Sequence, residues 1–153
     1  LQDIVRRQPF DGDALVELAD TMRQLADATG EVEQGYQAAC SHYEGALRIN
    51  QGNPEAISGL GEAFFDLGKW YGRQGRLEEA HRFLGMAGER YTQVLGIRPS
   101  DEVALYNLAC ICSLLGRLDE ASVYWLRCRR VEAASGTDMA PFLASAAADP
   151  DLA

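Results

Sequence analysis

Apolar residues recur at intervals of three and four along most of the chain, the spacing that places them on one side of an α-helix. Glycine turns at Gly30, Gly75 and Gly116, and proline breaks at Pro54 and Pro99, divide this pattern into successive helices. No segment of useful length alternates apolar and polar residues as a half-buried β-strand does. The pattern therefore predicts an all-α fold.

A six-residue motif occurs twice, with one conservative difference, in the second half of the chain. Residues 75–80 read Gly-Arg-Leu-Glu-Glu-Ala, and residues 116–121 read Gly-Arg-Leu-Asp-Glu-Ala. Each copy is a glycine turn that ends one helix, followed by acids that suit the positive N-terminal end of the next helix. An apolar helical pattern precedes each copy. A helix hairpin that recurs in this way predicts an array of repeats.

These hairpins resemble the tetratricopeptide repeat, whose 34-residue pattern is W-x2-L-G-x2-Y, then A-x3-F, then P. The third hairpin is the closest copy, with L-x2-L-A-x2-C at residues 105–112 and A-x3-W at residues 121–125. The second offers I-x2-L-G-x2-F at residues 57–64, and the first offers L-x2-L-A-x2-M at residues 15–22. The resemblance implies an α-α superhelix of stacked antiparallel helix hairpins with a C-terminal capping helix.

We predict one domain that is a fragment of a longer chain, because the sequence lacks an initiating Met and begins within a helical pattern. Its predicted parts follow the breaks in the apolar pattern. They are the end of a preceding helix with a linker (1–11), an elongated first repeat (12–53), an elongated second repeat (54–101), a third repeat (102–136), and a capping helix with a tail (137–153).

The first two repeats depart from the family pattern in length. From the small residue of the first helix to the turn glycine there are 11, 14 and 7 residues in the three hairpins. From that glycine to the closing apolar residue (Ile49, Ile97 or Val131) there are 19, 22 and 15. Both helices of the first and second hairpins are therefore predicted to gain four and seven residues, which project about 6 and 10 Å. Leu67, Tyr71, Leu84 and Tyr91 are predicted to be buried.

Composition and charge exclude several classes of partner. The 153 residues carry 23 acids against 14 bases, a net charge of −9, which disfavours nucleic acid and anionic membranes. No apolar run is long enough for membrane insertion. The four cysteines lie inside helical patterns, where free thiols act as small apolar residues. We therefore expect the cytoplasm or another reducing intracellular compartment, although the native N-terminus is not seen.

No arrangement of residues indicates catalysis. The chain has no glycine-rich phosphate loop, no Gly-x-Ser-x-Gly elbow and no His-Glu-x-x-His. His42 and His81 have no partners at zinc-motif spacing. Gly59-Leu60-Gly61 is a fragment of a nucleotide loop without the preceding strand, and close helix packing explains it better. The sequence predicts no enzyme, no cofactor and no metal.

The resemblance implies a module for protein–protein interaction whose concave groove is lined by the outward face of each repeat's first helix. Acids dominate this face, so we expect it to hold a basic or amphipathic segment of a partner protein or peptide, with Phe65 and Tyr106 as apolar anchors and with Glu62 and Asp66 exposed. Only Asn107 matches the Lys, Arg and Asn clamp with which some relatives bind a chaperone's terminal carboxylate. The predicted groove residues are Asp13, Val16, Glu17, Asp20, Glu55, Ser58, Glu62, Phe65, Asp66, Lys69, Arg73, Tyr106 and Asn107.

Two other functions stay open at this point. The chain can be a structural or self-assembly element that associates through its truncated N-terminal end. It can also be a regulatory domain of an enzyme that lies outside this fragment.

The segment from Asp138 to Ala148 carries Phe142 and Leu143 on one helical stripe. We expect it to fold back as the cap of the third hairpin, because a terminal repeat otherwise exposes apolar surface. Deleting everything after Gly136 should lower the melting temperature and the solubility. A truncated chain that melts at the same temperature as the full chain would show that the segment is not a cap.

Overall fold

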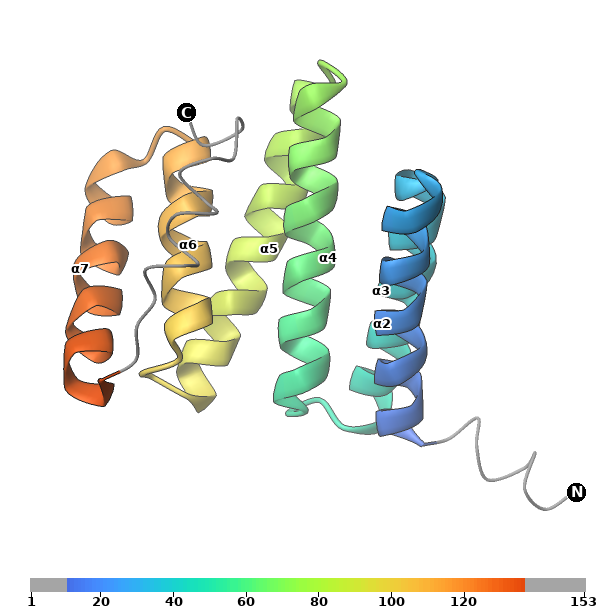
Figure 1. The fold of residues 1–153 in the computed structure, drawn as a ribbon, viewed down its shortest axis with the longest axis horizontal. Coiled ribbons are helices and arrows are strands. Elements are labelled where there is room, and N and C mark those ends of the chain that lie inside the picture. The colour runs from blue at the N-terminus through green and yellow to red at the C-terminus, as the bar shows by residue number, and fades with distance from the viewer. Residues whose placement is uncertain (1–10, 137–153) are drawn as a thin grey trace, which may run out of the picture.

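The structure of the chain, a computed structural model, describes residues 11–136. That range contains six helices and no strand, so the predicted all-α class is confirmed. The helices are α2 (Gly12–Thr29), α3 (Val32–Ile49), α4 (Pro54–Arg73), α5 (Leu77–Ile97), α6 (Glu102–Leu114) and α7 (Leu118–Ser135). They form three antiparallel hairpins, α2–α3, α4–α5 and α6–α7, that stand side by side as in a tetratricopeptide-like array (Figure 1).

The first helix of every hairpin begins at a side-chain cap. Oxygens of Asp11, Asn53 and Asp101 accept hydrogen bonds from backbone N–H groups of the first turn at 3.0, 3.0 and 2.9 Å. Such a cap satisfies a backbone donor that the helix itself leaves unpaired. The second helices have no side-chain cap and begin directly after the turn.

The two copies of the repeated motif, at residues 75–80 and 116–121, form the same turn. Gly75 and Gly116 both adopt a φ of 74°, in the left-handed region that only glycine enters at little cost. The N–H of the next residue bonds back to a carbonyl near the helix end, Arg76 to Tyr71 at 2.9 Å and Arg117 to Cys112 at 2.7 Å. This is a Schellman closure, and it reverses the chain within three residues.

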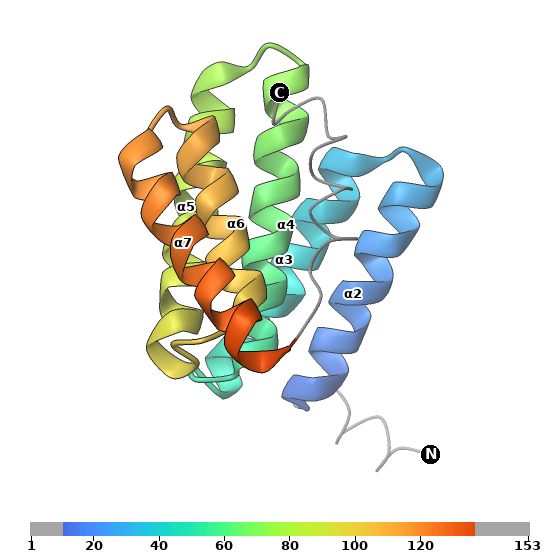
Figure 2. The same ribbon diagram turned by 60° about the vertical axis from the view of Figure 1, so that its left-hand side comes forward.

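The first helices α2, α4 and α6 lie along one side of the array, and we call this side the first-helix face. In Figure 1 they lie nearest the viewer, with α3 and α5 behind them, and Figure 2 shows the same order from the α7 side. Helix α4 is central because it packs against α3, α5 and α2. Its buried side chains cover most of the helix circumference and leave one stripe, which includes Glu55, Glu62 and Asp66, open to solvent.

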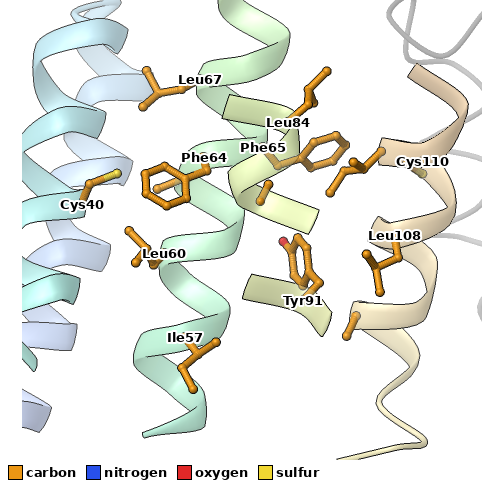
Figure 3. Packing of buried hydrophobic residues seen from close by; sticks show 14 of the residues in the cluster. Cys40, Ile57, Leu60, Phe64, Phe65, Leu67, Leu84, Tyr91, Leu108 and Cys110 are labelled. Atoms are coloured by element: carbon orange, nitrogen blue, oxygen red, sulfur yellow. The ribbon is translucent and has the colours of Figure 1, made fainter. Parts of the chain in front are cut away.

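Glycines allow the closest helix contacts in the core. A Cβ built on Gly59 would lie 2.4 Å from the ring of Tyr43, and one on Gly68 would lie 2.8 Å from Leu84 Cγ. The backbone of α4 thus touches side chains of both α3 and α5, and the packing interpretation of Gly59-Leu60-Gly61 is confirmed. Figure 3 shows the apolar residues of α4 directed toward α3 on one side and toward α5 and α6 on the other.

The additional residues of the second hairpin are helical and packed. Helix α4 has 20 residues and α6 has 13, so the predicted gain of seven is present in the first helix. The α4–α5 turn extends beyond those of both neighbouring hairpins (Figure 1). Leu67, Tyr71, Leu84 and Tyr91 are all buried, as predicted. Tyr71 stacks on Phe83 at 5.2 Å and donates its hydroxyl to Glu33 at 2.8 Å, which ties the extension to α3.

Three predictions about the helices are wrong. Helix α7 continues past Val131 to Ser135, so α3, α5 and α7 have 18, 21 and 18 residues, and equal gains in both helices of a hairpin do not hold. Leu18 and Leu25 follow the helical spacing of core residues but are 42% and 61% exposed, because α2 packs chiefly against α3 and α4. Trp125, which stands at an apolar position of the repeat pattern and is for that reason expected in the core, is 38% exposed. The predicted N-terminal helix end and the predicted capping helix lie outside the described residues.

Two alanine substitutions compare a standard core position with the extension. Leu108 and Tyr71 are 3% and 2% exposed. We expect Leu108→Ala and Tyr71→Ala each to lower the free energy of unfolding by about 2–5 kcal/mol, because each leaves a cavity in close-packed surroundings. Chemical denaturation would measure both. A loss below about 1 kcal/mol for Tyr71→Ala alone would mean that the extension contributes little to the common core.

Candidate functional site

Carboxylates from two first helices meet where α2 lies beside α4. On α2, Asp13, Asp20 and Asp27 follow one another at intervals of seven, so they share one side of the helix. On α4, Glu62 and Asp66 are one helical turn apart. This arrangement concentrates negative charge on the first-helix face.

Arg23 joins the two helices within this group of acids. Its Nη1 donates to Glu62 Oε2 at 2.8 Å, and its Nη2 lies 3.6 Å from Asp66 Oδ2. The Arg23 side chain is only 18% exposed, so solvent screens these pairs less than it screens surface pairs. The guanidinium therefore bridges α2 to α4 beneath the surface.

Two tyrosines of α3 complete the network. Tyr43 donates its hydroxyl to Asp20 and accepts a hydrogen bond from Arg23 Nη1 at 3.3 Å. Tyr36 donates to Asp27 Oδ1 at 2.7 Å and lies 3.4 Å from Asp66 Oδ2. Both rings are buried and only the hydroxyls meet the acids. We call this group the Arg23 cluster; it consists of Asp20, Arg23, Asp27, Tyr36, Tyr43, Glu62 and Asp66.

Burial controls the protonation of the Arg23 cluster. It raises the pKa of Asp66, and the positive charges of Lys69 and Arg23 only partly offset this rise. Burial also raises the pKa values of Tyr36 and Tyr43, so both hydroxyls stay protonated as hydrogen-bond donors. Lys69 Nζ is 3.8 Å from Asp66 Oδ1 and 4.9 Å from the centre of the Phe65 ring.

Several predicted groove residues are less accessible than expected. Phe65, Tyr106 and Asn107 are only 9%, 5% and 7% exposed, so the two aromatic rings are core residues and do not form open anchors. Tyr106 packs near Trp125, with ring centres 6.4 Å apart. Glu62 and Asp66 are partly covered, with side chains 39% and 32% exposed. Helical periodicity predicts an outward position for all five residues, because it takes no account of the neighbouring helices that cover them.

The other predicted residues are more open. Asp13, Glu17, Asp20 and Arg73 are exposed, while Val16, Ser58 and Lys69 are half-buried. Glu55 is exposed and pairs with Arg98 at 2.9 Å, a contact that lowers its pKa. The structure thus brings the acids of α2 and α4 together and leaves Tyr106 and Asn107 of α6 as covered members of the same face.

Sequence reasoning missed part of the Arg23 cluster. Asp27 continues the seven-residue spacing of Asp13 and Asp20, and this spacing could have indicated it. The helical spacing of Tyr36 and Tyr43 indicates packing residues, which is correct for their rings and incomplete for their hydroxyls. No sequence signal places a hydroxyl beside an acid of another helix, because that contact depends on how the hairpins pack.

Other chemistry has little support within residues 11–136. In this range no group of three or more His, Cys, Asp or Glu side chains is arranged to hold a metal ion. The four cysteines are buried and unbonded to one another, and burial raises the pKa of Cys40 to about 12. None of the described helices is long and apolar enough to cross a bilayer.

Comparison with known proteins identifies the repeat. Residues 66–101, from within α4 to the end of the loop after α5, match the tetratricopeptide repeat family. The chain contains a tetratricopeptide repeat. Together with the six stacked helices, this match places the fold among tetratricopeptide-like helical repeats, which generally mediate protein–protein interactions. A search among curated proteins finds no relative with significant similarity to this chain.

The raised pKa of Asp66 predicts how stability depends on pH. Between the ordinary pKa of an aspartate, about 3.9, and the raised native value, the folded protein binds the proton more tightly than the unfolded chain does. Stability from this group is therefore present below that window and is lost as the pH rises through it. We expect Asp66→Asn to unfold at a higher urea concentration than the wild type at pH 7, and to show no advantage at pH 4.

Glu55→Gln is the matched control, because the hydrogen bond from Arg98 lowers the pKa of Glu55. Its small effect should have the opposite sign, a loss of stability at pH 7 that disappears as the pH falls through the lowered pKa. An Asp66→Asn protein that is less stable than the wild type at pH 7 would show that the contacts with Arg23 and Lys69 outweigh burial.

Proposed function

We propose that the chain is a protein-interaction module that holds a basic or amphipathic segment of a partner on its first-helix face. One observation carries the proposal: Asp20, Asp27, Glu62 and Asp66 gather around the single guanidinium of Arg23. One arginine cannot neutralise four carboxylates, and Lys69 adds one further positive charge beside Asp66. An excess of negative charge remains to attract a positively charged segment.

The distribution of charge along the array supports this proposal. Residues 11–50 contain eight acids and two bases, a net charge of −6, which is most of the −9 of the whole chain. Exposed Asp13 and Glu17 extend the negative surface from the Arg23 cluster toward the start of α2. Such a field accelerates association with a positively charged partner and weakens as salt is added. Binding, rather than catalysis, is also the usual role of the family.

Self-association is a second candidate, and a separate observation favours it. Leu18 and Leu25 of α2 are exposed at one end of the described array, and Leu118 and Leu126 of α7 are 65% and 57% exposed at the other. Exposed leucines at the ends of a repeat array are typical of surfaces that stack on another unit. We propose a reducing compartment for either role, because all four cysteines are buried and none forms a disulfide.

A double charge reversal tests the proposed face. Asp13→Lys with Glu17→Lys changes two exposed acids that bond to no member of the Arg23 cluster. Reversal of Glu62 and Asp66 to lysine would instead place positive charges against Arg23, so these two acids, which the sequence predicts to be exposed, are unsuitable for a test that must leave folding intact. The probe is a fluorescein-labelled amphipathic helical peptide with lysines along its polar side. We expect about ten-fold weaker binding by fluorescence anisotropy at low salt.

The matched control is Glu44→Lys with Glu89→Lys, which makes the same change of charge on the second helices α3 and α5. It should bind the probe nearly as well as the wild type. Equal weakening in both double variants would mean that the probe responds to net charge alone. Unchanged binding in the α2 variant would mean that the acids serve only solubility.

A further inference from the structure

A cleft of about 380 Å³ opens between the second helices α3 and α5, which lie farther from the viewer than the first helices in Figure 1. The fully buried side chain of Leu60 on α4 forms its floor, and Leu47 of α3 lines one wall. Two guanidinium groups thus line one cleft from opposite walls. The polar residues of the lining are Glu44, Arg48, Gln51 and Arg90.

Arg48 is an exposed cation of this lining. It forms no hydrogen bond and no ion pair with any residue of 11–136, although the chain has an excess of nine acids over bases. Glu44 lies one helical turn before it on α3, yet the two groups are not within ion-pair distance. Arg48 can therefore take a carboxylate from outside the chain. Five other arginines of the same range already pair with a carboxylate, namely Arg23, Arg76, Arg98, Arg117 and Arg129.

Packing positions the side chain of Arg90 on the facing wall. A Cβ built on Gly61 would lie 3.2 Å from Arg90 Cβ, so the glycine lets the start of this side chain lie against α4. Arg90 Nη1 donates to Gln93 Oε1 at 3.0 Å, while Arg90 Nε is buried and has no partner. An amide oxygen is uncharged, so this hydrogen bond leaves the charge of the guanidinium unneutralised. Arg90 thus holds a positive charge at a fixed place beside the cleft.

Two guanidinium groups on facing walls have the chemistry to bind one carboxylate. Each guanidinium offers parallel N–H donors that match the planar carboxylate, and two carboxylate oxygens have lone pairs enough for both. With two arginines and one glutamate, the lining has a net charge of +1. This charge matches a carboxylate better than a phosphate of about −2. Leu47 and Leu60 suit the methylene stem of the side chain that carries the carboxylate.

We propose that Arg48 and Arg90 bind the carboxylate of an Asp or Glu side chain that a partner protein inserts into the α3–α5 cleft. This site lies on the second helices, whereas the proposed function uses the first-helix face, so neither depends on the other. The array then has two recognition surfaces with opposite charge preferences.

NMR titration with acetyl-Leu-Glu-Leu-amide tests the site, and acetyl-Leu-Gln-Leu-amide is the neutral control peptide. We expect the glutamate peptide to shift the backbone amide signals of Arg48 and Gln51 and the Nε–H signal of Arg90, and the glutamine peptide to shift none of them at equal ionic strength. Arg48→Gln should weaken binding about five- to ten-fold, because it removes one charged partner of the carboxylate. Glu44→Gln should tighten binding about two-fold, because it removes a like charge from the cleft.

Arg82→Gln is the matched control, since Arg82 is an exposed arginine of α5 that does not line the cleft. It should bind the glutamate peptide as the wild type does. Equal weakening in Arg82→Gln and Arg48→Gln would mean that the peptide responds to net charge alone, and would overturn the site. Arg90→Gln should weaken binding as Arg48→Gln does. If Arg90→Gln does not fold, exposed Arg48 decides the question.

Two further results would overturn the assignment. Inorganic phosphate that binds more tightly than the glutamate peptide, with the same loss in Arg48→Gln, would identify a phosphate site. Shifts of the same signals that depend on the concentration of the protein alone would show that carboxylates of a second copy occupy the cleft. Neither result affects the proposed function, which the lysine-bearing amphipathic probe tests on the first-helix face.

Discussion

The contact between the ring of Tyr43 and the backbone of α4 at Gly59 is the constraint on which the first half of the array depends. A Cβ at Gly59 would be 2.4 Å from that ring, closer than packed carbon atoms approach, so only glycine allows α3 and α4 to lie this near. This spacing buries the ring completely while its hydroxyl reaches Asp20 and Arg23. One close approach therefore fixes the packing of two hairpins and also assembles the Arg23 cluster beside them.

Buried rings with bonded hydroxyls join α3 to α2 within the first hairpin and α4 of the second hairpin to α3. Tyr36, Tyr43 and Tyr71 each bury an apolar ring and place the oxygen on a carboxylate of another helix. The boundary between the second and third hairpins has a different character, because Tyr91 buries its ring there without a bond to its hydroxyl. The network between α2 and α4 bonds both tyrosine hydroxyls of α3, while Arg23 Nε within it is itself buried without a partner.

The unequal lengths of the hairpins have a physical basis in the helical period. Seven residues are about two turns, so α4 gains length over α6 without rotating its buried side away from α3 and α5. The extension finds partners on the side of the first hairpin, where Glu33 accepts from Tyr71 and pairs with Arg76 at 3.3 Å. Arg76 also lies over the Tyr71 ring at 4.5 Å, so the Gly75 turn is joined to α3 by charge and by stacking. These contacts extend the interface between the first two hairpins along the longer helix.

The sequence by itself determined the helical class, the positions of the turns and the similarity to the tetratricopeptide repeat. Periodicity, caps such as Asp11 and Asn53, and the glycines at 30, 75 and 116 are local signals that act within one or two turns of the chain. It also determined the excess of acid on α2, since Asp13, Asp20 and Asp27 need only one helix to align. Only the tertiary structure decided that Phe65, Tyr106 and Asn107 are covered and that Leu18 and Leu25 are open, because burial depends on which neighbouring helix faces each position. It likewise decided that Arg23 meets Glu62 across 39 residues of sequence while Tyr91 stays unbonded, because such contacts are set by the packing distance between hairpins and by no local pattern.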